Sequence, residues 1–190
     1  VKPDSVFGTL MVSSTRLAPQ RHAELAAVGD SFSLWHENHP IAEPIRLTFP
    51  VPDGADVSRV HVYRQDDGWR RQDTLKNSEG LTIETRRLGL FQAFEDRHAP
   101  FLRITSPSAD YRAQTKRPIM KARLSDAHSG IDGFGAAMNG KWLLVAYDPE
   151  HEELIWDRDE DLPAGPQTIE FWASDHAGNV SRKTVSVTIP

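Results

Sequence analysis

The stretch Ala173-Ser174-Asp175-His176-Ala177-Gly178-Asn179 decides the fold. It follows a run of alternating apolar and polar residues over positions 168–175 and precedes a second alternating run that ends at Ile189. Alternation with a period of two predicts strands whose side chains point to opposite faces of a sheet. Gly and Asn accept the positive φ angles that tight turns need. The segment therefore predicts a β-hairpin near the end of the chain.

The same kind of pattern continues along the rest of the sequence, where short alternating runs are separated by Pro, Gly, Asn and Asp clusters. This is typical of an all-β sandwich. We expect strands at 5–13, 31–36, 45–49, 59–64, 68–75, 81–86 and 89–94, and then at 101–105, 118–125, 133–138, 141–147, 153–157, 167–174 and 181–189. Only residues 19–27 have a helix-forming composition, enough for two turns at most.

Two sets of about seven strands predict two tandem β-sandwich domains. A polar stretch that ends at Pro100 separates them, so we expect domains at residues 1–98 and 99–190. In the second domain, Asn139-Gly140 lies between apolar runs and predicts a type I′ hairpin, because that turn needs positive φ at both central positions.

Composition limits the classes of function. The chain has 190 residues, of which 38% are hydrophobic and 26% charged, and no run approaches the roughly 20 apolar residues of a membrane helix. A net charge of −5 gives no electrostatic footprint for nucleic acid. The absence of cysteine excludes disulfides, thiolate metal sites and cysteine nucleophiles. No signal-peptide pattern follows Val1, which we interpret as the start of a piece of a larger polypeptide.

Residues 100–190 resemble a bacterial immunoglobulin-like (Ig-like) module of the type closed by a D-x-A-G-N hairpin. The resemblance rests on the closing hairpin together with six earlier segments. These are Pro100 to Ile104, Pro118 to Asp126, Ser129-Gly130-Ile131-Asp132, Met138 to Lys141, Tyr147-Asp148-Pro149 and Leu162-Pro163-Ala164-Gly165. It implies an Ig-like or fibronectin-like sandwich and is silent on function.

Residues 40–98 resemble a ZU5-like β region, through segments 44–49, 60–64, Gly68-Trp69 and 88–96. In large bacterial envelope proteins such a region often precedes an Ig-like module, and similar pairs form the tails of some secreted LytM-type (M23) peptidases. The resemblance implies a non-catalytic spacer or docking scaffold of a larger extracytoplasmic protein, whose partners are the other domains of its own polypeptide. A further hypothesis is that the chain is an accessory region of a peptidoglycan-processing metallopeptidase.

One acidic run invites a metal interpretation. Asp157, Asp159 and Asp161 alternate as carboxylates do at the start of a calcium loop. Leu162 and Thr168 stand where an EF-hand needs glycine and a bidentate glutamate, so an EF-hand is excluded. We interpret the run as a solvated loop. The alternative is a structural Ca²⁺ that joins the two modules, with Asp96 or Asp126 assisting; no other cofactor is expected.

Three polar residues are predicted to stabilise turns. Asp175 falls on the inward face of its strand, and an ionised carboxylate is rarely buried without partners. We expect it to accept backbone N–H groups of the following turn, as in an Asx-turn, and Asn179 to belong to that turn. Asp126 is expected to act in the same way in its own turn.

Catalytic motifs are missing. His128-x-x-x-Asp132 has the spacing of one half of the zinc motif of M23 peptidases, but the H-x-H partner is absent from the sequence. There is no G-x-S-x-G elbow, P-loop or G-x-G-x-x-G. We therefore expect no enzymatic activity from this chain.

Five tryptophans raise the alternative of carbohydrate binding, because sugars stack on exposed indole faces. The competing interpretation is that each indole fills a sandwich core. Trp172 is expected to face outward, opposite Ile169 and Phe171. Trp172 and Trp69 are the two candidates for a site that binds cell-wall polysaccharide; a protein partner is the other possibility.

Overall fold

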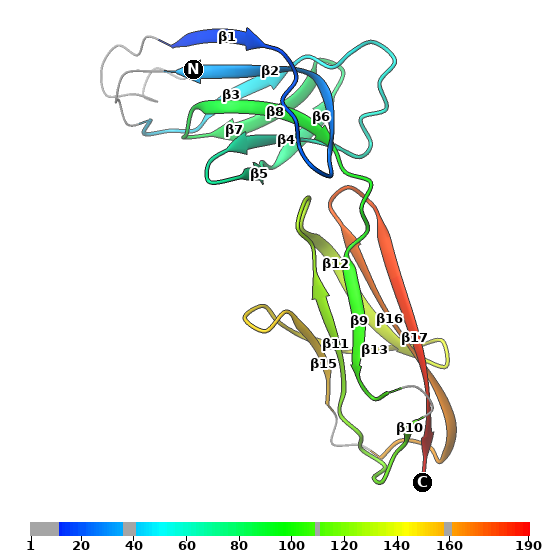
Figure 1. Cartoon of the computed structure of the whole chain (residues 1–190). Coiled ribbons are helices and arrows are strands. Elements are labelled where there is room, and N and C mark those ends of the chain that lie inside the picture. The colour runs from blue at the N-terminus through cyan, green and yellow to red at the C-terminus, as the bar shows by residue number, and fades with distance from the viewer. Residues whose placement is uncertain (1–11, 36–40, 109–110, 158–160) are drawn as a thin grey trace. The chain divides into compact units, whose positions relative to one another are not determined.

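The computed structural model describes residues 12–35, 41–108, 111–157 and 161–190, and within these ranges it consists of strands, turns and irregular segments without a helix (Figure 1). The prediction of an all-β protein is confirmed. The chain divides into two compact units, Val1–Arg97 (unit 1) and His98–Pro190 (unit 2). Most of the strand expected at 5–13 lies outside the described residues. Among the described residues, no helix has the length and apolar character that crossing a bilayer requires.

Unit 1 contains two sheets. The larger sheet has the order β1 (Ser13–Leu17), β2 (Ala26–Trp35), β8 (Gly89–Glu95), β4 (Val60–Gln65) and β5 (Trp69–Arg71). The smaller sheet has the order β3 (Ile45–Phe49), β7 (Gly80–Thr85) and β6 (Thr74–Asn77). Their facing sides enclose one apolar core, to which β3, β4, β7 and β8 contribute Phe49, Val60, Val62, Leu81, Ile83, Phe91 and Ala93. Unit 1 is therefore a β-sandwich.

The helix considered for residues 19–27 does not form. The backbone N–H groups of Glu24 and Leu25 donate to Nδ1 of His22 at 3.1 and 3.0 Å, which makes a local turn. Strand β2 then begins at Ala26 and pairs with β8. Tertiary pairing thus overrides the weak helix propensity of this segment.

Unit 2 is a second sandwich. One sheet has the order β9 (Phe101–Ser106), β11 (Met120–Ser125), β15 (Glu153–Trp156) and β14 (Ala146–Asp148). The other has the order β10 (Tyr111–Arg112), β17 (Val180–Ile189), β16 (Gly165–Asp175), β12 (Ile131–Met138) and β13 (Lys141–Leu143). In chain order these match the A-B-E-D and G-F-C-C′ sheets of immunoglobulin-type sandwiches, with β10 as an extra strand parallel to β17.

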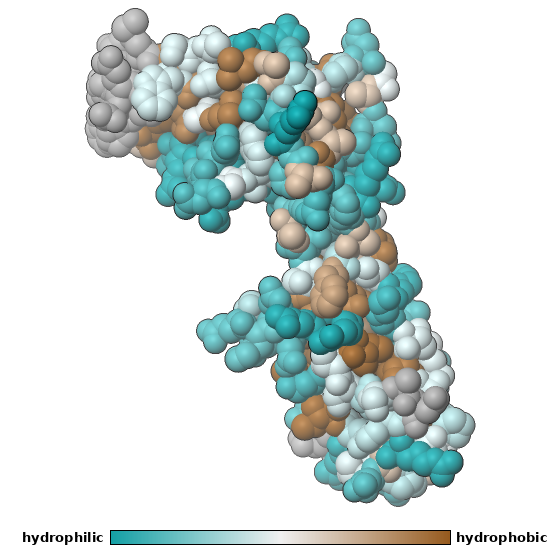
Figure 2. Space-filling model, in the orientation of Figure 1, coloured by the Kyte–Doolittle hydropathy of each residue, from teal (hydrophilic) through white to brown (hydrophobic). Residues whose placement is uncertain are grey.

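The core of unit 2 follows the alternation seen in the sequence. Ile169, Phe171 and Ala173 of β16 are fully buried, whereas Glu170 and Trp172 lie on the outer face of the sheet. Trp156 of β15 is the largest fully buried side chain of this core. Burying each large aliphatic or aromatic side chain contributes roughly 1.5–3 kcal/mol. With these apolar side chains buried, hydrophilic residues cover much of the face of each unit that Figure 2 shows, and apolar residues form smaller groups on it.

The β12–β13 connection is the predicted type I′ hairpin. Asn139 and Gly140 have φ angles of 48° and 78°, both positive as this turn requires. The Asn139 side chain also accepts the backbone N–H of Thr168 at 2.8 Å and donates to Gln167 at 2.6 Å, so the turn is bonded to the start of β16.

Candidate functional site

The turn between β16 and β17 is built around the Asp175 carboxylate, which is buried. Its Oδ1 accepts the backbone N–H of Asn179 at 2.8 Å, and its Oδ2 accepts the Asn179 side-chain amide at 2.9 Å. The backbone N–H of Gly178 donates to the carbonyl of Asp175 at 3.0 Å, and Gly178 has a φ of 80°. The carboxylate therefore holds both the backbone and the side chain of Asn179 in one orientation.

The turn after β11 lies beside it. Oδ1 of Asp126 accepts the backbone N–H groups of His128 at 3.0 Å and Gly130 at 2.6 Å. The carbonyl of Gly130 then accepts the backbone N–H of His176 at 3.1 Å, which joins the two turns. These are the B–C and F–G turns, which share one end of an immunoglobulin-type sandwich.

The chain enters unit 2 at the same end. Nδ2 of Asn179 donates to the carbonyl of His98 at 3.2 Å, and the Ser181 hydroxyl donates to the carbonyl of Pro100 at 2.5 Å. The His98 ring packs edge-on against the His128 ring, with centroids 5.2 Å apart. The β16–β17 turn and the first residue pair of β17 thus hold the incoming segment, and we call this arrangement the entry clamp (residues 98–100, 126–130 and 175–181).

Asp126 and Asp175 are the acidic pair of the entry clamp, with carboxylate oxygens within 4.8 Å of each other. The N–H donors described above offset the repulsion between the two carboxylates. Ca²⁺ takes six to eight oxygen ligands, of which this pair would supply only a part. Asp96 belongs to unit 1, where it is buried and its backbone N–H donates to the carbonyl of Arg59 at 3.1 Å. A structural Ca²⁺ stays a prediction.

Two of the three aspartates of the acidic run, Asp157 and Asp161, lie within the described residues. Asp157 and Asp161 are exposed, and Oδ1 of Asp161 binds Nε of Arg117 at 2.7 Å. Asp159 lies outside the described residues. His128 and Asp132, the spacing that resembles half of a zinc motif, have different neighbours, since Asp132 binds Nδ1 of His176 at 3.3 Å.

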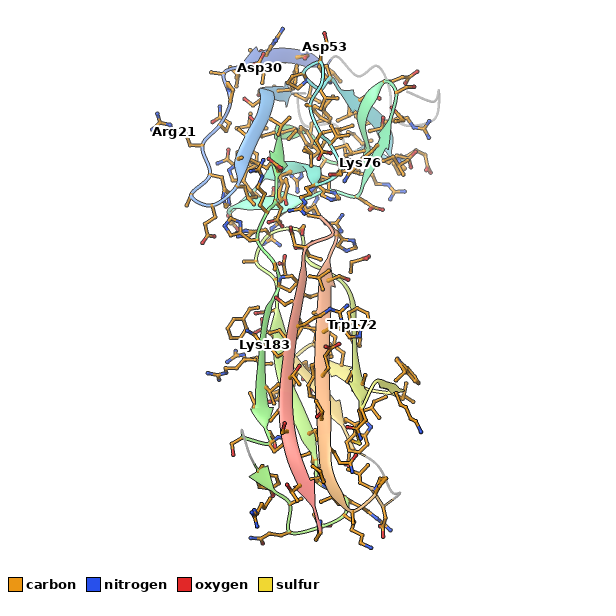
Figure 3. All side chains as sticks on the ribbon, turned by 90° about the vertical axis from the view of Figure 1, so that its right-hand side faces the viewer. Arg21, Asp30, Asp53, Lys76, Trp172 and Lys183 are labelled. Carbon is orange, nitrogen blue, oxygen red and sulfur yellow. The ribbon has the colours of Figure 1, made fainter. Side chains whose placement is uncertain are left out.

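The two tryptophans proposed for sugar binding are both partly buried. Trp69 packs edge-on against Phe94, with ring centroids 4.9 Å apart, beside a small apolar cluster of unit 1 formed by Leu25, Tyr63 and Phe94. Trp172 projects from β16 over β12 (Figure 3), where a Cβ added to Gly135 would lie 2.7 Å from its Nε1. The indole of Trp172 therefore occupies space that the glycines of β12 leave empty.

The most exposed tryptophans are Trp142, at 69%, and Trp35, at 67%, which the sequence reasoning did not select. Trp142 pairs with Ala137 on the face that also carries Trp172, because Trp172 pairs with Gly135 two residues away on β12. Its position could have been found from the sequence. Residue 142 is the second after the type I′ turn and alternates with the buried Leu143.

The strand order of unit 2 and the two-sheet architecture of unit 1 define the class, a pair of β-sandwich modules. No protein-family model and no curated protein matches the sequence. The assignments to D-x-A-G-N and ZU5-like modules therefore stay predictions.

Three solved structures are similar to parts or most of the chain. An endo-beta-1,4-mannanase from Thermotoga petrophila is 11% identical with a TM-score of 0.42; the match covers 50% of this chain and only 21% of the mannanase. CopC from Methylosinus trichosporium OB3b is 21% identical with a TM-score of 0.37, over 48% of this chain and 93% of CopC. The fibronectin(III)-like modules of Clostridium thermocellum CbhA are 14% identical with a TM-score of 0.39, over 94% of each chain.

Proposed function

We propose that the chain is a non-catalytic pair of β-sandwich modules that spaces or docks other domains of a larger protein. Each unit is supported by its own apolar core between two sheets, which suits a module within a longer polypeptide. The extracytoplasmic bacterial setting, and a place beside a peptidoglycan-processing metallopeptidase, belong to this proposal through the family resemblance alone.

The observation that carries the proposal is the path of the chain through unit 2. The entry clamp bonds the incoming segment to the start of β17, at Asn179 and Ser181. The chain leaves unit 2 from the other end of the same strand, after Ile189 (Figure 1). Ten residues of β-strand span about 33 Å. The entry of the chain and Ile189 thus lie at opposite ends of β17, about the length of a strand apart.

A distance measurement tests this geometry. The chain has no cysteine, so two introduced cysteines can be spin-labelled without background. Ala99→Cys marks the entry and Thr188→Cys the exit, both at exposed positions. We expect one narrow distance distribution between the labelled backbones near 25 Å, because about eight residues of strand lie between the two levels. A broad distribution, or one centred far below that value, would show that unit 2 does not act as a spacer.

A second candidate function is glycan binding on the outer face of β12, β13 and β16. The exposed indole of Trp142 and the partly buried indole of Trp172 share this face, and the strand between them carries only Gly133, Gly135 and Ala137. The Trp172 indole covers the glycines, so the exposed indole of Trp142 offers the stacking surface, since the C–H faces of sugars pack on aromatic rings.

Titration of the tryptophan fluorescence with soluble oligosaccharides of cell-wall and plant polysaccharides tests this candidate. We expect Trp142→Ala to weaken binding at least tenfold, whereas Trp35→Ala, a matched loss of an equally exposed indole in unit 1, leaves it unchanged. Equal effects of the two variants would remove glycan binding at this face from consideration.

A further inference from the structure

Unit 1 has a hollow of about 460 Å³ whose walls are charged. It is lined by Arg64, Asp66, Asp67, Arg70 and Arg87. These residues come from the β4–β5 hairpin and from the segment that precedes β8. Asp66, Asp67, Arg70 and Arg87 are exposed, so the hollow is a depression open to solvent. Three arginines against two aspartates give the hollow an excess of positive charge.

Two of the arginines face each other across a strand pair. Arg64 of β4 and Arg70 of β5 are directly opposite each other in the antiparallel ladder, so their side chains leave the same face. Like charges in this position destabilise a strand pair. Arg87 adds a third guanidinium to the same hollow. An anion between them would turn this repulsion into attraction.

Arg64 is held firmly in the wall. Its side chain is only 10% exposed and forms an ion pair with Asp66. A guanidinium has five N–H donors, and one carboxylate can accept at most a parallel pair of them. Within the described ranges, no ion pair engages Arg70 or Arg87. The hollow thus contains one buried, paired guanidinium and two that form no ion pair with a described residue.

We propose that this hollow binds a small hydroxylated organic anion, such as a sugar acid or a sugar phosphate. The guanidinium groups of Arg70 and Arg87, beside the ordered Arg64, receive the carboxylate or phosphate, because the planar fork of arginine matches these oxyanions. The carboxylates of Asp66 and Asp67 accept hydrogen bonds from hydroxyl groups on the rest of the molecule. Anion binding in this hollow requires neither glycan binding at the tryptophans nor the entry clamp. A test of anion binding is therefore independent of the proposed spacer role.

Binding to the full chain is measured by NMR titration of its backbone amides, at low salt, with four probes: glucuronate, glucose 6-phosphate, inorganic phosphate and neutral glucose. We expect the two sugar anions to shift the amides of residues 64–70 and 87–89, inorganic phosphate to bind more weakly, and glucose to bind least. Raising the salt concentration should weaken the binding of the anions and leave the binding of glucose unchanged. The stronger of the two sugar anions identifies whether the ligand bears a carboxylate or a phosphate.

We expect Arg70→Gln and Arg87→Gln each to lower the affinity for the preferred anion about tenfold, because each removes a charge-assisted contact. Arg21→Gln is the matched control, because Arg21 is an exposed arginine of unit 1 that projects away from the strands (Figure 3). Arg70→Gln should also raise the unfolding midpoint in the absence of anion, since it removes the like-charge pair with Arg64.

Three results would overturn the inference. No site-specific shift with either sugar anion would mean that Asp66 and Asp67 already neutralise the hollow. An equal loss in Arg21→Gln would mean that the anions bind the surface charge at large. Equal affinity for inorganic phosphate and glucose 6-phosphate would contradict the assignment to a hydroxylated ligand.

Discussion

Nδ2 of Asn179 donates a hydrogen bond to the carbonyl of His98 across 3.2 Å, and these residues lie 81 positions apart in the sequence. The same amide group donates to Asp175, whose carboxylate also accepts the Asn179 backbone N–H. A single buried asparagine therefore connects the turn that closes the sandwich to the segment that enters it. The closing hairpin thereby fixes the point at which the chain enters unit 2.

Replacing Asn179 by Ala should lower the free energy of unfolding of unit 2 by about 1–3 kcal/mol, because it leaves the buried Asp175 carboxylate and the His98 carbonyl without this donor. Denaturant titration measures the change. Ser186→Ala, on the exposed face of β17, is the control and should change stability by less than about 0.5 kcal/mol. Equal stability of the two variants would mean that the amide of Asn179 does not hold the entry segment.

The effect of Gly135→Ala on the stability of unit 2 should reverse its sign when Trp172 is also replaced, which a double-mutant cycle can measure. Gly135→Ala places a Cβ 2.7 Å from Nε1 of Trp172, so it should displace the indole and destabilise unit 2 by about 1 kcal/mol or more. In a Trp172→Ala background the space is free, and Gly135→Ala should instead stabilise the strand by roughly 0.5–1 kcal/mol. Thermal unfolding and tryptophan emission measure both effects. Additive effects would show that the indole does not occupy the space above Gly135.

The pKa of Asp148 should lie below the ordinary value of an aspartate. Nδ1 of His151 lies 2.8 Å from its carboxylate, and this hydrogen bond, with the backbone N–H groups of His151 and Glu150, lowers the pKa of Asp148 below its ordinary value. A lowered pKa in the folded state contributes stability above the ordinary carboxyl pKa, and this contribution is lost as the pH falls through the lowered value. Carbon-13 NMR of the carboxyl group should show an upward shift of the midpoint in His151→Ala. An unchanged midpoint would exclude the His151 side chain as the cause, since the variant keeps the backbone N–H of residue 151.

The acidic run should not be the place where calcium acts. Asp161 already binds Arg117, and a ligand that binds only the folded state must raise its stability. We expect the change in Tm on moving from a chelator to Ca²⁺ to be the same for the wild type and for the Asp157→Asn, Asp161→Asn double variant. A Ca²⁺-dependent rise in Tm that disappears in the double variant would make the acidic run a metal site.

Local chemistry in the sequence was sufficient to predict many elements of unit 2. The single strand expected at 141–147 was wrong, because the chain crosses there from β13 in one sheet to β14 in the other, and β10 was not predicted. The alternation around Phe171 defines the two faces of β16, and Asn139-Gly140 defines a turn, because each depends only on neighbouring residues. The same alternation of buried and exposed side chains holds for the neighbours Trp142, which is exposed, and Leu143, which is buried. Spacing along the chain therefore carried most of the information about the faces of the sheets.

Contacts between distant strands were beyond the same reasoning. The partial burial of Trp69 depends on Phe94, which reaches it through pairing of β4 with both β5 and β8. The placement of Trp172 depends on the glycines of β12. The charged hollow likewise needs Arg87, which reaches the β4–β5 hairpin from the segment before β8. Register between strands is a property of the whole sandwich, and one sequence does not reveal it.

The most direct test of the entry clamp is the distance distribution between spin labels at Ala99→Cys and Thr188→Cys, recorded with and without Asn179→Ala. If Asn179 fixes the entry of the chain, the narrow distribution near 25 Å should broaden clearly in the Asn179→Ala background and stay narrow with Ser186→Ala. A distribution that is equally narrow with and without the Asn179 amide would contradict the role given to this residue.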